Sequence, residues 1–269
     1  MKKNPKPTLI IIGGGEDKKT DKKILKKIIA LSGEENAKIG VITTATDKPM
    51  EVGLEYENIF YDLGAKKVST IPIVDRKHSN IRSPLDDLLN YDCLFFTGGD
   101  QLKISSIIGG TYFHNVIYEF YSQGKVLAGT SAGASMMSHI MIVEGYDEEA
   151  PMKVTINLAP GMGLIKNVII DQHFNQRGRI GRLLAGVAQN PQILGIGIDE
   201  DTAIIVEDNR SFFVLGKGVA TIIDGRGINY TNISEQFPNE PLALTNVVMH
   251  ILPENFGYDL CHKKPIIKE

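Results

Sequence analysis

The chain has 269 residues, of which 42% are hydrophobic, so it can bury the core of one large α/β domain and its composition argues against disorder. Its formal net charge is −3, and charged residues are spread along the whole length, which excludes the basic surface typical of nucleic-acid or anionic-membrane binding. Its two cysteines, Cys93 and Cys261, can build neither a disulfide framework nor a multi-cysteine zinc site, so we expect a reducing compartment.

The start of the chain shows no targeting segment. Residues 1–7 are basic, but the apolar segment that follows, residues 9–12, ends at three glycines. Such a segment is too short for the core of a signal peptide and far too short to span a bilayer. We therefore expect a cytoplasmic protein without a membrane partner.

The first half of the chain alternates short β-branched segments with helix-length segments. The expected strands are residues 8–12, 38–43, 67–71, 93–97 and 126–130. Because they are continuously apolar, they predict strands covered on both faces, and hence a three-layer α/β fold with a mostly parallel sheet between helices. Ligands in such sheets bind beyond the carboxyl ends of the strands, so functional residues are expected there.

The pattern changes after about residue 140. A polar loop over residues 144–153 precedes further expected strands at residues 168–170, 193–198, 203–206 and 211–214. Several of these follow one another without helices, which predicts antiparallel additions to the same sheet. No linker or internal repeat divides the chain, so we expect residues 1–269 to form a single α/β domain.

A nucleophile is indicated by residues 129–133, Gly-Thr-Ser-Ala-Gly, where an apolar strand meets a small-residue helix start. This is the context of a nucleophile elbow, in which small neighbours tolerate the strained backbone of the serine. The helix would then direct free N–H groups at a developing oxyanion. Ser131 is therefore the candidate nucleophile; the alternative is a serine that merely caps a helix.

A serine nucleophile needs a base, and the chain has six histidines. His173 alone directly follows an expected buried strand, within the sequence Asp171-Gln172-His173-Phe174. Its position at a strand end makes it the candidate base, although a structural loop histidine would look the same.

A carboxylate that orients the imidazole is expected where the strand 193–198 ends, at Asp199, Glu200 and Asp201. Alternation along an extended strand would turn Glu200 away from its two neighbours, but it does not choose among the three. These acids, with Asp171 and His173, could instead ligate a divalent metal, although no metal-binding spacing supports that alternative.

Two glycine-rich turns also follow strands. The turn at residues 98–101 can supply a second oxyanion donor, the amide of Gly99, opposite that of Ala132. The turn at residues 13–15 lacks both nucleotide-binding patterns, so we expect no nucleotide or other cofactor, and its glycines let the backbone approach the site closely.

Three arginines lie just after the candidate base: Arg177, Arg179 and Arg182. Arg179 and Arg182 would share one face of a helix, and guanidinium groups suit planar carboxylates. Near a histidine at a strand end, this cluster favours recognition of a substrate carboxylate over a merely solvated helix face.

Taken together, the motifs at residues 96–101, 129–134, 171–182 and 195–200 resemble those of cyanophycinases, in the serine-peptidase family that also includes peptidase E. The resemblance spans about residues 8–225. It implies a fold like class I glutamine amidotransferases, with serine in place of cysteine, and a homodimer. It also implies that Glu200 completes the triad and that the substrate pocket contains Gln101, Asp171, Gln172, Arg177, Arg179 and Arg182.

The implied activity is hydrolysis of cyanophycin, a polyaspartate with arginine on each β-carboxyl, to β-Asp-Arg dipeptides through an acyl-enzyme. The arginines would hold substrate carboxylates, and Asp171 or a nearby acid would hold the guanidinium. The alternatives are a peptidase E-like enzyme acting on short aspartyl peptides, a metal-dependent hydrolase and a binding module without activity.

Overall fold

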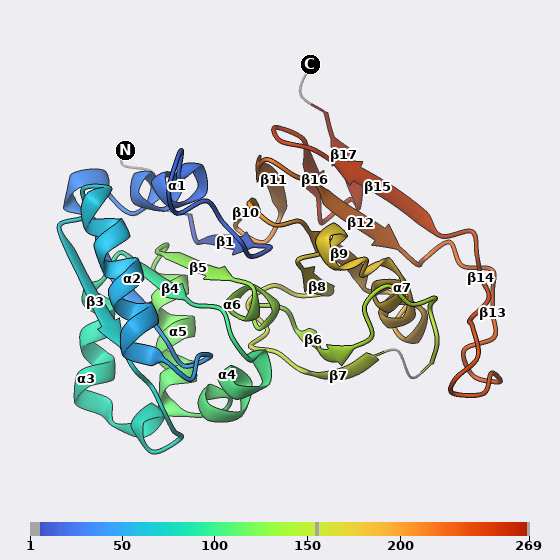
Figure 1. The fold of residues 1–269 in the computed structure, drawn as a ribbon, viewed down its shortest axis with the longest axis horizontal. Helices are drawn as coiled ribbons and strands as arrows, with labels where there is room; N and C mark the ends of the chain where they lie inside the picture. The colour runs from blue at the N-terminus through green and yellow to red at the C-terminus, as the bar shows by residue number, and fades with distance from the viewer. Residues whose placement is uncertain (1–5, 154–155, 268–269) are drawn as a thin grey trace.

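The computed structural model describes residues 6–153 and 156–267, so most of the basic start, residues 1–5, lies outside it. Its largest sheet has nine strands, and five of them run parallel in the order β1-β5-β4-β2-β3 (Figure 1). These strands agree with the expected ones within a residue or two: β1 Thr8–Ile12, β2 Lys38–Ile42, β3 Lys67–Ile71, β4 Cys93–Phe96 and β5 Val126–Thr130.

Helices cover both faces of this parallel region because its apolar side chains alternate between the faces. Ile10 and Ile12 pack in one core with α1 (Lys23–Leu31) and α2 (Pro49–Asp62), whereas Leu9 and Ile11 join the core on the other face. The second core is completed by α3 Arg82–Asp86, α4 Gln101–Ile108 and α5 Tyr112–Ser122. The α/β class and the helix-flanked sheet predicted from the sequence are confirmed.

Antiparallel strands extend the same sheet beyond β1. β10 (Thr202–Glu207) pairs antiparallel with β1, and β11 (Ser211–Gly216) pairs antiparallel with β10. Two strands from the end of the chain, β16 (Gly257–Asp259) and β17 (Lys264–Ile266), complete the edge. The expectation of added antiparallel strands at residues 203–206 and 211–214 is therefore confirmed.

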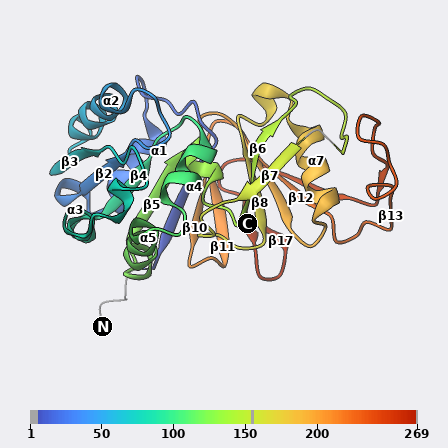
Figure 2. The same cartoon turned by 90° about the horizontal axis from the view of Figure 1, so that it is seen from below.

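The expectation was wrong for residues 168–170 and 193–198, which form a separate sheet (Figure 2). This four-stranded sheet has the order β15-β12-β9-β8, with β8 Val168–Gln172, β9 Leu194–Ile198, β12 Ala220–Asp224 and β15 Val248–Leu252. β8 and β9 pair parallel, because α7 (Ile180–Gln189) connects them as a crossover helix and packs on their sheet.

The remaining elements are short. The β6–β7 hairpin (Ile140–Gly145 and Ile156–Pro160) follows the four-residue helix α6 (Ala132–Ser135). The chain also contains four 3-10 turns: η1 Glu34–Asn36, η2 His78–Asn80, η3 Asp87–Asn90 and η4 Asn175–Arg177. Two short strands, β13 Tyr230–Thr231 and β14 Leu244–Thr245, pair with each other. Among the helices of the described ranges, none has both the length and the apolar character needed to cross a bilayer.

The two sheets share a hydrophobic core. Ile204 and Phe212 of the nine-stranded sheet belong to the same buried cluster as Ile196, Ile198 and Ile222 of the four-stranded sheet. Side chains that are buried in one shared core are expected to become exposed to water in a single unfolding transition. We therefore propose that the two sheets form one cooperative domain.

Thermal unfolding tests this proposal. Far-UV circular dichroism, which follows the backbone, and near-UV circular dichroism, which follows tyrosine packing, should report one coincident transition, because neither sheet keeps its core without the other. Two separated transitions would show that the sheets are independent domains.

Candidate active site

Ser131 lies at a sharp turn between β5 and α6. Its backbone is in the positive-φ region, with φ 52° and ψ −110°, and its N–H donates to the carbonyl of Ile12 at 3.0 Å. A Cβ on Gly129 would overlap the backbone of Gly133, so the turn requires glycine there. Ser131 makes no side-chain cap bond to the helix, so the alternative of a capping serine is not what the structure contains.

The side chains of Ser131, His173 and Glu200 lie in one continuous hydrogen-bonded chain. Ser131 Oγ is 3.0 Å from His173 Nε2, and His173 Nδ1 is 2.6 Å from Glu200 Oε1. Since a carboxylate only accepts, Nδ1 donates to Glu200 and Nε2 is left to accept from the serine hydroxyl. This is the arrangement that removes a proton from a serine nucleophile.

The three neighbouring acids after β9 have three different environments. Asp199 is buried and accepts hydrogen bonds from the backbone N–H groups of Asn175 and Val219. Asp201 instead accepts from the N–H of Asp17 and pairs with Lys217. Glu200 alone reaches the imidazole.

The position of Glu200 is supported from the backbone side as well. Its N–H donates to the side-chain oxygen of Gln176 at 2.9 Å, which ties the end of β9 to the η4 turn. Its side chain remains 41% exposed, whereas that of His173 is 13% exposed. The imidazole is thus largely enclosed, whereas the carboxylate is open to solvent.

The glycine turn after β1, residues 13–15, binds the backbone beside the candidate base and beside the candidate carboxylate. The carbonyl of Gly13 accepts from the N–H of His173 at 2.7 Å, and that of Gly14 accepts from the N–H of Asp201 at 2.9 Å. A Cβ on Gly14 would lie within 3.0 Å of the His173 ring, and one on Gly15 would lie 2.9 Å from a Glu200 oxygen. The expectation that these glycines allow a close approach to the site is confirmed.

The two predicted oxyanion donors belong to the turns that follow β4 and β5. The N–H groups of Gly99 and Ala132 have no acceptor among the residues that the structure describes. A Cβ on Gly98 would be 3.9 Å from Ser131 Oγ, so this turn passes beside the hydroxyl, and a Cβ on Gly99 would collide with the carbonyl of Ala45. The turn can therefore only be glycine, while the oxyanion role of Gly99 and Ala132 stays a prediction.

Two of the predicted pocket residues bind other parts of the protein through their amides. Gln101 donates from Nε2 to the carbonyls of Ile142 and Val143, at 2.8 and 2.9 Å, and so attaches the β6 strand to the start of α4. Gln172 accepts from Arg179 at 2.8 Å. These contacts hold both side-chain amides within the protein, and a role of either residue in a substrate pocket stays a prediction.

The three arginines of the predicted pocket differ in exposure. The Arg177 side chain is exposed, and it has no hydrogen-bond partner within the described part of the chain. Arg182 is buried and binds both oxygens of Asp171, with a 2.7 Å bond from Nε. Asp171 therefore already holds a guanidinium from its own chain, and its role in binding the guanidinium of a substrate stays a prediction.

Arg179 is also buried and donates from Nε to Asp147 at 2.8 Å. Burial lowers the pKa of Arg179, and the charge of Asp171 opposes this effect. Asp147 lies in the polar loop after residue 144, where no motif of the sequence marks it as functional.

A second carboxylate without a sequence motif, that of Glu16, binds the residue that precedes the candidate nucleophile. Glu16 is buried, and it accepts hydrogen bonds from the hydroxyls of Thr130, at 2.6 Å, and Tyr56. Burial and the neighbouring Glu16 raise the pKa of Tyr56 well above its usual value, so its hydroxyl stays protonated and keeps donating. The available signal was an acid directly after the three glycines.

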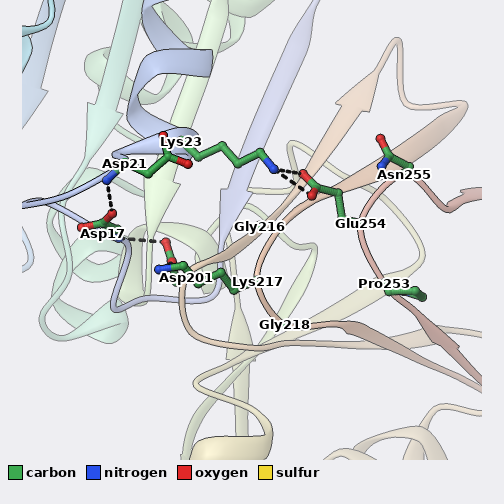
Figure 3. Close-up of a pocket in the computed structure, with 10 residues that line it drawn as sticks. All are labelled: Asp17, Asp21, Lys23, Asp201, Gly216, Lys217, Gly218, Pro253, Glu254 and Asn255. Carbon is green, nitrogen blue, oxygen red and sulfur yellow. Dashed lines mark hydrogen bonds and ion pairs between the residues drawn. The ribbon is translucent and has the colours of Figure 1, made fainter.

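The described residues include no group of three or more His, Cys, Asp or Glu side chains placed to hold a metal ion. A cavity of about 490 Å³ does open beside Asp201, but its lining includes neither Ser131 nor His173 (Figure 3). There Lys23 pairs with Glu254, and the Asp17 side chain accepts from the backbone of its own turn. These carboxylates already have partners of their own.

Replacing Gly14 with alanine tests the role of the glycine turn. We expect Gly14→Ala to displace the imidazole, because its Cβ would occupy the space of the His173 ring. The downfield proton resonance of His173 Nδ1–H, which reports its bond to Glu200, should then shift or disappear.

Gly64→Ala is the matched control. Gly64 also has a positive φ, of 93°, but a Cβ there would meet nothing within 4 Å. Both variants therefore carry backbone strain and only one disturbs the ring. An unchanged His173 resonance in Gly14→Ala would contradict the role of the glycine turn.

Comparisons with known proteins agree with the resemblance seen in the sequence. The model of peptidase family S51 matches residues 9–214. The cyanophycinase of Geminocystis herdmanii (strain PCC 6308) is 36% identical over 267 residues, covering 99% of this chain and 98% of the relative. The cyanophycinase of Trichormus variabilis (strain ATCC 29413 / PCC 7937) is 40% identical over 251 residues, covering 92% of this chain and 83% of the relative.

Solved structures with the same fold include a peptidase from an acI-B1 Actinobacterium, with a TM-score of 0.64 at 20% identity over 92% of this chain and 98% of that one. A putative peptidase E from Listeria monocytogenes EGD-e has a TM-score of 0.56 at 15% identity over 79% of this chain and 100% of that one. At such identities these structures speak for the fold alone. The family match and the cyanophycinase relatives show that the chain belongs to peptidase family S51, and it is therefore a peptidase.

Proposed function

We propose that the chain is a serine peptidase that hydrolyses cyanophycin and releases β-Asp-Arg dipeptides. One observation carries the proposal: the hydroxyl of Ser131, the imidazole of His173 and the carboxylate of Glu200 form a relay with contacts of 3.0 and 2.6 Å. The cyanophycinases that match nearly the whole chain support the choice of substrate.

The proposed reaction begins when Ser131 Oγ attacks a backbone carbonyl of the polymer. His173 Nε2 takes the hydroxyl proton as the C–O bond forms, and Glu200 stabilises the resulting imidazolium. The amides of Gly99 and Ala132 donate to the oxyanion, and each such donor typically lowers the barrier by about 3 to 4 kcal/mol.

The tetrahedral intermediate then collapses. The C–N bond breaks, His173 returns its proton to the leaving amine, and the carbonyl stays on Ser131 as an ester. Water, deprotonated by the same imidazole, hydrolyses this ester and restores the hydroxyl.

Substrate recognition has to satisfy two charges, because each cyanophycin unit displays a carboxylate and a guanidinium. The exposed Arg177 lies four residues after His173, and its backbone N–H donates to the His173 carbonyl at 3.1 Å. It is therefore the arginine best placed to meet a substrate carboxylate without any rearrangement.

Two other proposed properties accompany the enzymatic one. The homodimer remains a prediction from the family resemblance, and the cytoplasmic location remains a prediction from the short apolar segment at residues 9–12. Val248, Met249 and Ile251 expose apolar side chains along β15, an edge strand of the four-stranded sheet, and such a surface is consistent with an interface.

Mass spectrometry of the products formed from purified cyanophycin tests substrate, bond and mechanism together. The wild-type protein should release the β-linked dipeptide. Ser131→Ala should reduce turnover by about a million-fold, as loss of the nucleophile does in another serine peptidase. Ser105→Ala, on helix α4, controls for loss of a serine hydroxyl elsewhere.

The same assay separates the alternatives. Cleavage of soluble aspartyl dipeptides but not of the polymer would favour a peptidase E-like activity. Loss of activity in the presence of a chelator would favour a metal-dependent hydrolase, whereas the serine mechanism predicts no effect. Near-normal turnover by Ser131→Ala would refute the proposal.

A further inference from the structure

Arg179 and Arg182 form a buried cluster with Asp171 and Asp147, in which Asp147 is the most exposed side chain. The side chains of Arg179 and Arg182 are 6% and 5% exposed, and that of Asp171 is 1% exposed. The Asp147 side chain, in contrast, is 38% exposed. A substrate that approaches these arginines therefore encounters a carboxylate of the protein before it encounters a guanidinium.

Charges in the cluster are matched one to one. Arg182 is held by both oxygens of Asp171, so that pair is complete. Arg179 lies 3.6 Å from the same Asp171, but its Nε donates to Asp147 at 2.8 Å. Arg182 also reaches the same Asp147 oxygen, at 3.4 Å. Asp171 balances one of the two guanidinium charges, and Asp147 balances the other.

The loop that carries Asp147 lies directly on the start of α7. Glu148 N–H donates to the Gly178 carbonyl at 3.2 Å, and a Cβ on Gly178 would be 2.8 Å from the Glu148 side chain. A Cβ on Gly181 would likewise collide with the carbonyl of Glu149. Because these two positions have no side chain, the loop approaches α7 closely enough for Asp147 to contact the buried guanidinium groups.

The attachments on either side of this contact are independent of Asp147. Gln101 holds the carbonyls of Ile142 and Val143 on the strand before the loop, and the N–H of Leu242 donates to the Pro151 carbonyl at 2.7 Å. Displacement of Asp147 would therefore leave both ends of the short segment between them attached.

We infer that Asp147 is an internal competitor of the substrate: its carboxylate occupies the position on Arg179 that a carboxylate of the substrate takes when it binds. The inference rests on the proposed function, since cyanophycin presents such carboxylates. The exchange conserves charge and hydrogen bonding, because one carboxylate replaces another on the same guanidinium. Arg179 is thus never left buried without a counter-charge.

An internal competitor lowers the apparent affinity by the fraction of molecules in which it is bound. If Asp147 holds Arg179 in about nine molecules of ten, the apparent affinity is reduced by about ten-fold. It also selects among ligands, because only a group that matches a carboxylate in charge and geometry can displace it.

Kinetics with Asp147→Asn test the inference. Asparagine keeps the shape of the side chain but removes its charge, so KM for cyanophycin should fall, by about three- to ten-fold, and kcat/KM should rise accordingly. Glu149→Gln is the matched control, since it removes one negative charge from the same loop at a side chain that makes no ion pair among the described residues; its KM should not change.

Two results would overturn the inference. A raised KM in Asp147→Asn would show that Asp147 contacts a cationic group of the substrate, and an unchanged KM would show that the ion pair only supports the loop. The dissociation constant of L-aspartate, measured by calorimetry, gives the same comparison without the polymer and should decrease in Asp147→Asn. Absence of cyanophycin cleavage by the wild-type protein would refute the proposed function separately.

Hydrogen exchange covers the case in which Asp147→Asn does not fold. In Ser131→Ala protein, binding of cyanophycin should accelerate exchange of the Glu148 amide, because displacement of Asp147 frees the loop from Gly178. Greater protection of that amide on binding would contradict the inference.

Discussion

Three consecutive backbone carbonyls, those of Ile12, Gly13 and Gly14, hold the chain segments that carry the proposed catalytic groups. They accept hydrogen bonds from the N–H groups of Ser131, His173 and Asp201, respectively. Ser131 follows β5, His173 follows β8 and Asp201 lies between β9 and β10, so one short turn joins strands of both sheets. Because each bond is made by backbone atoms, the turn sets the positions of these chain segments before any side chain contributes.

The same three donors adopt backbone conformations that are unfavourable for residues with side chains. Ser131, His173 and Asp201 have φ values of 52°, 48° and 47°. Each such residue costs on the order of 1 to 3 kcal/mol and persists only where its surroundings fix it. The glycine turn supplies that restraint at all three places, and in return the strand ends direct the serine and the imidazole at one another. Part of the backbone strain of the described chain thus lies where chemistry is expected to occur.

Much of this arrangement is predictable from local patterns. The parallel strands follow from apolar segments separated by helix-length segments, and Ser131 and His173 follow from their positions at strand ends. Glu200 does not follow from alternation, because the strand ends at Ile198 and the chain turns, so Asp199 and Asp201 take up separate contacts. Only the resemblance to a known family pointed to Glu200.

Features made by contacts between distant segments were not predictable. The separate sheet was missed because α7, only ten residues long, was not recognised as the crossover that makes β8 and β9 parallel. Asp147 and Glu16 were missed because their partners are far away in sequence: Arg179 lies 32 residues from Asp147, and Thr130 lies 114 residues from Glu16. No periodicity or motif encodes such pairs.

The most direct test of the central claim is the rate at which a fluorophosphonate labels the protein, with the modified residue located by mass spectrometry. We expect a single modified residue, Ser131, and a labelling rate that falls by about 10²- to 10⁴-fold in His173→Ala, because the hydroxyl then has no base. Labelling at another serine, or an unchanged rate in His173→Ala, would show that these groups do not act together.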